Sequence, residues 1–175
     1  MMNKNELAQQ IKATAQLKGS FKLRSGAVSD TYFDKYLFES DPQLLLAICQ
    51  EMAKLLPADV EILAGLEMGG IPVVTVLSQV TGLPAAFIRK EAKEYGTCKY
   101  AEGPSLIGKR VAIIEDVVSS GGAIVDALAK LDDDGIQPAA IICVIDRETG
   151  GRENLVATGY DLLSVLTMTD IQGAS

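Results

Sequence analysis

Apolar residues recur along the chain with two different periods. Over residues 7–15 they are three or four positions apart, which predicts a short amphipathic helix on the flank of the fold that stops at Gly19. Asp41 is a residue type preferred at a helix N-cap, and Pro42 is one preferred at the first helical position. The apolar residues that follow them at the same spacing predict a helix over residues 42–56.

Four continuous apolar runs follow and alternate with further helical stretches. The runs cover residues 62–65, 85–88, 110–114 and 139–145, and helices are predicted over residues 71–81 and 123–131. A continuous apolar run suits a strand that is covered on both faces. Strands that alternate with helices at this spacing predict an α/β fold with a mostly parallel central sheet flanked by helices. Ligands of such sheets bind beyond the carboxyl ends of the strands, so we expect the functional residues just after these runs.

The apolar period is lost between Arg89 and Gly108, where basic residues, glycines and a proline replace it. This segment, here named the 89–108 loop, is predicted to be irregular. A compact domain seldom keeps so long a loop unless it acts as a lid or a binding loop. The chain of 175 residues can bury one core and shows no internal repeat, so we predict a single domain over residues 1–175.

Composition removes several classes of chemistry. The chain has no histidine, which excludes a Ser-His-Asp triad, histidine acid-base catalysis and imidazole metal sites. Carboxylates, lysines, arginines, hydroxyls or backbone groups must therefore do the chemistry. The three cysteines, Cys49, Cys98 and Cys143, form no close pair, and nothing at the amino terminus resembles a secretory signal. This favours reduced thiols in the cytoplasm and no zinc site.

Charge and hydropathy narrow the choice of partners. No apolar stretch approaches the length of a membrane span, because the run over residues 44–56 is interrupted by polar side chains, so no membrane partner is expected. The 16 basic and 23 acidic residues give a net charge of −7. This charge opposes binding to nucleic acid, but it leaves room for a small anionic ligand held by a local cluster of positive charge.

The most informative segment is residues 111–123, which combines an apolar strand, two acids, a turn of serines and glycines, and a helix. The turn from Ser119 to Gly122 can present hydroxyls and N–H groups to a phosphate at a helix start. Glu115 and Asp116 would repel a bare phosphate, so the ligand should also carry hydroxyls, a cation or both, as a ribose phosphate with Mg²⁺ does. The segment is neither a Walker A loop nor a dinucleotide fingerprint. The competing interpretation is an ordinary strand-to-helix turn with solvated acids.

Residues 111–123 resemble the phosphoribosyl pyrophosphate (PRPP) signature of type I phosphoribosyltransferases, and other segments resemble orotate phosphoribosyltransferases in particular. These segments are residues 21–26 with 32–34, similar to the amino-terminal orotate segment; 69–72, similar to the diphosphate loop; 89–93, similar to a mobile catalytic loop; and 146–148, similar to the carboxyl-terminal site turn. The likeness keeps the family's order from about Phe21 to Thr169. It implies the type I phosphoribosyltransferase fold with a small amino-terminal hood over about residues 1–40.

The resemblance also implies a reaction. Orotate would take the ribose 5-phosphate group of PRPP, giving orotidine 5′-monophosphate and diphosphate in the biosynthesis of UMP, a pyrimidine nucleotide. Breaking the bond at the anomeric carbon leaves positive charge on the sugar and negative charge on the diphosphate, so cations near the leaving group lower the barrier. The family further implies Mg²⁺ as a cofactor and a homodimer in which the mobile loop reaches the neighbouring subunit's site.

The resemblance assigns roles to particular residues. Lys93, Asp116 and Glu115 are the expected catalytic residues: Lys93 stabilises the leaving diphosphate, and the two acids hold the sugar hydroxyls and the water shell of Mg²⁺. The residues expected to bind PRPP are Gly69, Gly70, Arg89, Lys90, Lys93, Glu115, Asp116, Val117, Val118, Ser119, Ser120, Gly121, Gly122 and Ala123. Mg²⁺ is expected to be held mainly by substrate and water, with Asp116 as the candidate direct ligand.

Base recognition is assigned to a second set of residues. Orotate carries a carboxylate and ring carbonyls that a planar guanidinium can meet with paired hydrogen bonds, so Arg147 is the expected specificity residue. The residues expected to contact orotate are Ser119, Arg147, Arg24, Tyr32 and Phe33. The alternative for Arg147 is a salt bridge with Asp146 or Glu148, and for the aromatics it is simple core packing. Tyr95 stands where many members have histidine, and Gly69 where many have lysine, so roles of those side chains do not transfer.

Three other functions stay open at this point. A phosphoribosyltransferase for another base, such as a purine or uracil, would share the phosphate signature, although Arg147 and Arg24 favour an anionic pyrimidine. A non-catalytic regulator that senses PRPP could use the same fold, but the basic loop argues against it. A receiver-like signalling domain would carry its acid pair after an early strand, whereas Glu115 and Asp116 come late.

Overall fold

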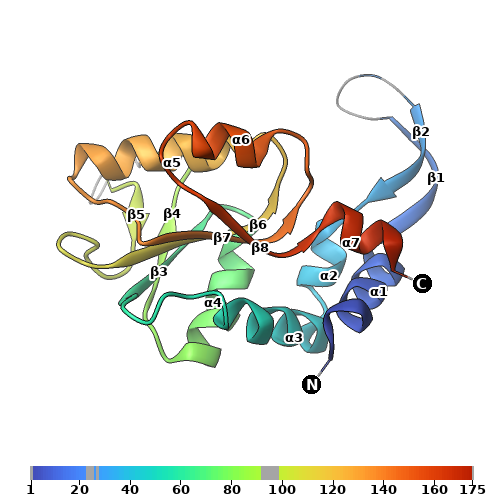
Figure 1. Cartoon of the computed structure of the whole chain (residues 1–175), viewed down its shortest axis with the longest axis horizontal. Helices are drawn as coiled ribbons and strands as arrows, with labels where there is room; N and C mark the ends of the chain where they lie inside the picture. Colours follow the sequence, from blue (N-terminus) through green and yellow to red (C-terminus); the bar gives the residue numbers. More distant parts are fainter. Residues whose placement is uncertain (1, 23–25, 27, 92–98, 175) are drawn as a thin grey trace.

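The computed structural model describes residues 2–22, 26, 28–91 and 99–174. Its centre is a six-stranded sheet in the order β5-β4-β3-β6-β7-β8, parallel except for β5, which runs antiparallel to β4 (Figure 1). The strands are β3 (Ile62–Leu66), β4 (Ala85–Ile88), β5 (Ala101–Glu102), β6 (Val111–Val118), β7 (Ala140–Asp146) and β8 (Leu162–Thr167). This confirms the predicted α/β fold with a mostly parallel sheet.

Helices cover both faces of this sheet (Figure 1). α3 (Pro42–Ala53) and α4 (Gly70–Thr81) lie on one face, and α5 (Gly122–Asp133) and α6 (Gly151–Val156) lie on the other. Side chains of β6 alternate between the two cores: Ala112 and Ile114 pack with α3 and α4, whereas Ile113 packs with α5. Both faces need apolar residues, which explains the continuous apolar runs in the sequence.

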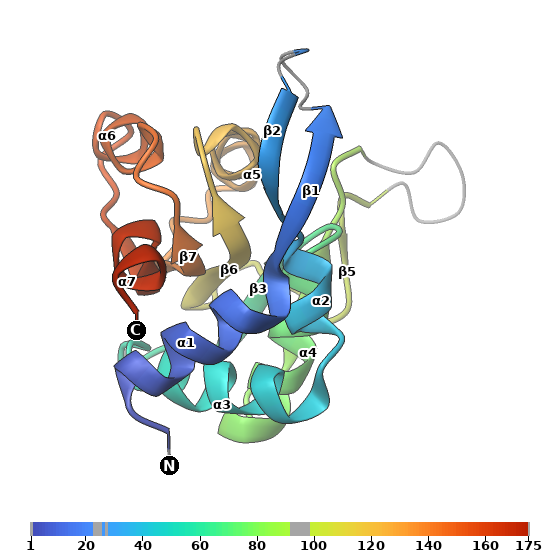
Figure 2. The same cartoon turned by 90° about the vertical axis from the view of Figure 1, so that its right-hand side faces the viewer.

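The amino-terminal segment and the last helix form a layer beside the sheet (Figures 1 and 2). Its elements are α1 (Lys4–Ala15), the antiparallel strands β1 (Gln16–Lys22) and β2 (Val28–Phe33), α2 (Lys35–Glu39) and α7 (Met168–Gly173). α7, from the other end of the chain, thus joins the region predicted as the hood. Lys4 Nζ of α1 lies 2.9 Å from Asp170 Oδ2 of α7, which ties the two helices together.

The first helix ends at Ala15, so the prediction that Gly19 stops it is wrong. Gly19 lies inside β1, and the pairing with β2 begins at Gln16, which lies opposite Phe33. No residue of either strand is buried. The pair therefore lacks the strict alternation of buried apolar and exposed polar residues that identifies a strand in a sequence.

Two other differences bear on the site. β6 continues to Val118, beyond the predicted run, so Glu115 and Asp116 lie inside the strand; Glu115 pairs with Cys143 of β7. The 89–108 loop is not wholly irregular, because it contains β5. The apolar pattern of the sequence does not predict β8, α6 or α7. In the described part of the chain no helix is both long and apolar enough to cross a bilayer.

Candidate active site

The turns that follow β3, β6 and β7 meet at one edge of the sheet, as predicted for a parallel sheet (Figure 1). These strands are neighbours in the order β3-β6-β7 and run in the same direction. The turn after β3 contains Gly69, the turn after β6 begins at Ser119, and the turn after β7 begins at Arg147. The topology thus gathers three of the sequence segments assigned to substrates.

The turn after β6 forms a small cradle in front of α5. Its pocket of about 150 Å³ is lined by Glu115, Val117, Val118, Ser119, Ser120, Gly121, Gly122, Ala123 and Ile124. The N-cap residue of α5, Gly121, has a φ of 77°, a left-handed conformation that glycine adopts without strain. No described side chain caps this helix start, so its first N–H groups are available to an anion. All the residues predicted from Val117 to Ala123 therefore line one pocket.

α6 packs against this cradle and supports it. Asn154 Nδ2 donates a hydrogen bond to the Ser120 carbonyl at 3.0 Å. A Cβ at position 151 would lie 2.5 Å from the Ser119 carbonyl oxygen, so only glycine fits beside the turn. Sequence reasoning missed both supporting residues. The adjacent glycines at positions 150 and 151 were the available signal for a close backbone approach.

The two acids of β6 take different environments. Glu115 is 8% exposed, lines the cradle and accepts a hydrogen bond from the Asp116 N–H at 3.0 Å. Burial, followed by the nearby charge of Asp116, raises the pKa of Glu115 well above its ordinary value. Asp116 is 1% exposed, and its Oδ2 lies 2.5 Å from Lys35 Nζ. The role of the two acids in holding sugar hydroxyls stays a prediction. In the structure Glu115 lines the cradle, and Asp116 is paired with Lys35.

Asp116 is enclosed by α2 and by the turn after β3. Glu39 of α2 is 6% exposed, and burial together with Asp116 raises its pKa to about 9. Burial opposes ionisation of Asp116. Hydrogen bonding to its carboxylate by Glu39, Glu115 and Lys35, together with the positive charge of Lys35, outweighs burial and lowers the Asp116 pKa. On the other side, a Cβ at Gly69 would overlap the Asp116 carboxylate. A side chain at position 69 is therefore incompatible with this placement of Asp116.

A larger pocket of about 460 Å³ adjoins the cradle. Predicted base-contact residues Tyr32, Phe33, Ser119 and Arg147 all line it. Ser119 and Val117 line both pockets, so the two cavities are contiguous. The fifth predicted base-contact residue, Arg24, lies outside the described residues. Lys35 also lines this pocket, and the sequence analysis did not select it.

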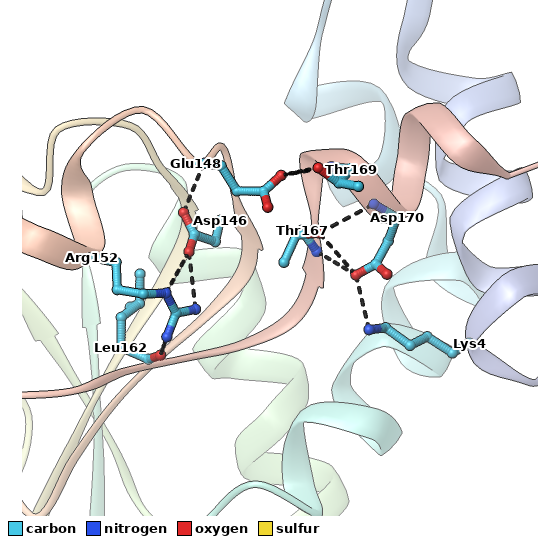
Figure 3. Close-up of polar contacts among 8 residues, drawn as sticks. All are labelled: Lys4, Asp146, Glu148, Arg152, Leu162, Thr167, Thr169 and Asp170. Atoms are coloured by element: carbon cyan, nitrogen blue, oxygen red, sulfur yellow. Dashed lines mark hydrogen bonds and ion pairs between the residues drawn. The ribbon is translucent and has the colours of Figure 1, made fainter.

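The turn that carries Arg147 is fixed by its two flanking acids (Figure 3). Asp146 Oδ2 lies 3.0 Å from Arg152 Nη2, and Arg152 Nη1 donates to the Leu162 carbonyl at 2.6 Å. Glu148 Oε2 accepts hydrogen bonds from the Thr169 N–H at 2.8 Å and the Thr169 hydroxyl at 2.6 Å. Both acids are thus engaged elsewhere, and within the described part of the chain neither forms the alternative salt bridge with Arg147.

A profile of the phosphoribosyl transferase domain matches residues 42–165. The chain belongs to the phosphoribosyltransferase family. The orotate phosphoribosyltransferase of Nocardioides sp. is 49% identical over 168 residues, which cover 96% of this chain and 94% of that protein. The crystal structure of Mycobacterium tuberculosis orotate phosphoribosyltransferase with Fe(III) dicitrate has a TM-score of 0.87 at 30% identity, covering 96% of this chain and 98% of that one. Its complex with PRPP has a TM-score of 0.82 at 27% identity and covers 97% and 98% of the two chains.

Ion pairs and hydrogen bonds hold the first residues of the 89–108 loop in this phosphoribosyltransferase. Arg89 Nε lies 3.2 Å from Glu102 Oε1 of β5, and the Lys90 N–H donates to Glu67 Oε1. Lys130 Nζ of α5 donates to the Lys90 carbonyl at 2.5 Å. Arg89 and Lys90 line a third pocket, of about 310 Å³, which shares Gly122 and Ala123 with the cradle and so lies beside it. Lys93 lies outside the described residues, so its predicted place at the leaving group is not seen.

The described residues do not form a closed metal cage. Within the described residues, no group of three or more Asp, Glu or Cys side chains lies close enough together to hold a metal ion. Mg²⁺ binds oxygen, keeps several waters and needs only one or two carboxylates when phosphates supply the other ligands. Glu115 offers such an oxygen at the cradle, whereas Asp116 is paired with Lys35. This donor set fits a Mg²⁺ ion that arrives on a diphosphate.

Sequence reasoning missed two side chains beside Asp116, namely Lys35 and Glu39 of α2. The available signal was Asp34, whose side chain caps α2 by accepting a hydrogen bond from the Tyr36 N–H at 3.1 Å. A helix that begins directly after Phe33 would have placed Lys35 next to a predicted base contact. α2 has only five residues, too few to show a helical apolar period.

Proposed function

We infer that this chain is an orotate phosphoribosyltransferase, which transfers the ribose 5-phosphate group of PRPP to orotate and releases diphosphate. The observation that carries this inference is the shared wall of the two pockets. Ser119 and Val117 line both the phosphate cradle and the pocket that contains Arg147, so a base in the larger pocket adjoins a sugar phosphate in the smaller one. Relatives named orotate phosphoribosyltransferase, up to 49% identical, support the same activity.

The arrangement suggests how the substrates lie. The 5′-phosphate binds the free N–H groups at the start of α5 and the Ser119 and Ser120 hydroxyls, and the ribose lies between this cradle and the acids of β6. The bond from the anomeric carbon to diphosphate breaks, and its electron pair leaves on the diphosphate. The deprotonated ring nitrogen of orotate supplies the pair for the new carbon–nitrogen bond. This step needs no protein base, which agrees with a chain that lacks histidine.

Arg147 gives the proposed base pocket its selectivity. It is exposed at the start of the turn after β7. Its backbone N–H donates a hydrogen bond to the Val118 carbonyl at 2.9 Å, next to the cradle. Its guanidinium is available because Asp146 and Glu148 have other partners. A guanidinium forms paired, charge-assisted hydrogen bonds with a carboxylate, which orotate has and uracil lacks.

We further propose that Mg²⁺ is the cofactor. When bound, Mg²⁺ neutralises charge on the diphosphate. Glu115 would hold it, directly or through water, and Asp116 is the second candidate once Lys35 moves aside. Lys93, together with Arg89 and Lys90, is proposed to neutralise the leaving group, on the strength of the family resemblance. Arg89 would first have to leave Glu102.

The proposed assembly is a homodimer in which the 89–108 loop reaches the partner's site. An apolar pocket of about 460 Å³ beside the diphosphate loop supports this, since Met68, Ile71, Pro72 and Phe87 line it and Met68 is 63% exposed. Such a patch is typical of a surface that is covered in an assembly. A cytoplasmic location is also proposed. It is supported by two free, buried cysteines in the described structure, Cys49 and Cys143.

A spectrophotometric assay of orotate consumption tests the proposed function. The purified chain is mixed with PRPP and orotate, with and without Mg²⁺, beside parallel reactions with uracil, hypoxanthine and adenine. Consumption of orotate alone, dependent on both PRPP and Mg²⁺, is expected. Arg147→Ala should raise the KM for orotate by tenfold or more. Turnover of a purine would assign another base, and PRPP binding without turnover of any base would indicate a sensor.

A further inference from the structure

Lys35 connects the hood to the junction of the two pockets. It is the first residue of α2, and the Asp34 cap fixes the start of that helix. Its ammonium lies 2.5 Å from Asp116 Oδ2 and 5.2 Å from the centre of the Tyr36 ring. The side chain is 33% exposed and lines the base pocket. The ammonium of Lys35 therefore contacts the acid assigned to the sugar, and the residue also lines the space assigned to the base.

The charges that line the base pocket are few. Among its described lining residues the cations are Lys35 and Arg147, and the only carboxylate is Asp34, which accepts the hydrogen bond from the Tyr36 N–H. The two cations come from opposite ends of the chain, Lys35 from α2 and Arg147 from the turn after β7. A ligand with two separate negative groups matches two cations on separate elements.

Lys35 keeps its charge in this position. Its Nζ lies 2.5 Å from the Asp116 carboxylate, and this ion pair favours the charged form of the lysine. The group is therefore an ammonium at neutral pH. An ammonium has three donors, and its contact with Asp116 leaves others free to reach a ligand in the pocket.

We propose that Lys35 is a second specificity residue for the base, which binds the bond-forming edge of anionic orotate while Arg147 binds its carboxylate. This rests on the proposed function. The bond-forming nitrogen must lie next to the sugar, and Lys35 is the cation beside the acid assigned to the sugar. The nitrogen carries negative charge when it has lost its proton, and the ring carbonyl next to it is a further acceptor. Lys35 thus favours the anionic form of the base at the place where it reacts.

The alternative role of Lys35 is that of a counter-ion for Asp116 alone. The two roles predict different kinetics, because a counter-ion acts on the sugar substrate and a specificity residue acts on the base. Lys35→Ala and Lys35→Arg are compared with wild type in steady-state assays in which orotate and PRPP are varied separately. Lys54→Ala is the matched control, because Lys54 also pairs with a carboxylate, that of Glu51, but does so on the surface at the C-terminal end of α3.

For Lys35→Ala we expect the KM for orotate to rise about tenfold or more, the KM for PRPP to change less than twofold, and Lys35→Arg to recover most of the loss. Calorimetric titration of orotate should show the same loss of affinity. An unchanged KM for orotate would refute the proposal, and a raised KM for PRPP alone is the result expected of a counter-ion. An equal rise in both KM values would also refute it. If the alanine variant unfolds, Lys35→Met, which keeps the apolar stem, replaces it. Failure of wild type to consume orotate would instead overturn the proposed function.

Discussion

Arg152 offers a test of what holds the turn that carries Arg147. Asp146 is 1% exposed, and its carboxylate lies 3.0 Å from the Arg152 guanidinium. Arg152→Ala leaves this carboxylate buried without its cation, and removal of one partner from a buried ion pair costs about 3–5 kcal/mol. The Arg152 side chain is 45% exposed, so water replaces part of the lost interaction. We therefore expect a loss of about 2–3 kcal/mol in the free energy of unfolding.

The measurement is thermal and urea unfolding followed by circular dichroism. In a chain of this size, each kcal/mol lowers the melting temperature by about 2–4 °C, so the variant should melt about 4–12 °C below wild type. Arg110→Ala is the matched control, because Arg110 Nε lies 2.9 Å from Asp59 Oδ2 while both side chains are more than half exposed. That pair should contribute about 0–1 kcal/mol. Equal melting temperatures for the two variants would show that burial of Asp146 does not strengthen its ion pair.

Three further perturbations test separate parts of the site. Gly69→Ala places a Cβ where a carboxylate lies, so the KM for PRPP should rise about tenfold in steady-state assays; an unchanged value would show that the diphosphate loop moves without cost. Thr169→Val removes the hydroxyl that donates to Glu148 at 2.6 Å, and a rise of about threefold in the KM for orotate alone is expected; no rise would mean that this contact does not position the turn. Burial raises the pKa of the Cys143 thiol and raises that of Cys49 to about 12. With the third cysteine replaced by serine, Ellman's reagent at pH 8 should therefore label the protein only as fast as it unfolds, and labelling at the rate of a free thiol would contradict this burial.

The sheet could be predicted from the sequence because its strands carry their own signal. β6 and β7 are covered on both faces, so every position of Val111–Ile114 had to be apolar. The helices α3 and α4 were found through helix signals, Asp41 at the start of one and Gly82 at the end of the other. The turns of the site followed from the rule that places ligands at the carboxyl ends of parallel strands.

Apart from α1, the elements of the hood could not be predicted in the same way, because they depend on contacts between distant segments. β1 and β2 bury no residue, and α7 has six residues, whose contact with α1 joins opposite ends of the chain. The place of Lys35 beside Asp116 depends on how α2 packs against β6, and no local pattern encodes that packing. The resemblance to a known family supplied residue roles within the family's motifs. Lys35 lies outside those motifs, so the resemblance did not indicate its contact with Asp116.

The net charge of the acidic site also depends on burial, which a sequence does not give. Three carboxylates, Glu39, Glu115 and Asp116, lie together, and counted as ions they would repel the phosphates of PRPP. Burial raises the pKa of Glu39 to about 9, so Glu39 is neutral at pH 7, and burial also raises the pKa of Glu115 above its ordinary value. Asp116 stays ionised, and the Lys35 ammonium at 2.5 Å balances it. The cluster therefore carries less negative charge than three ionised carboxylates would. The neutral Glu39 and the Lys35 ammonium thus reduce the repulsion that the phosphates of PRPP would otherwise meet at this edge of the sheet.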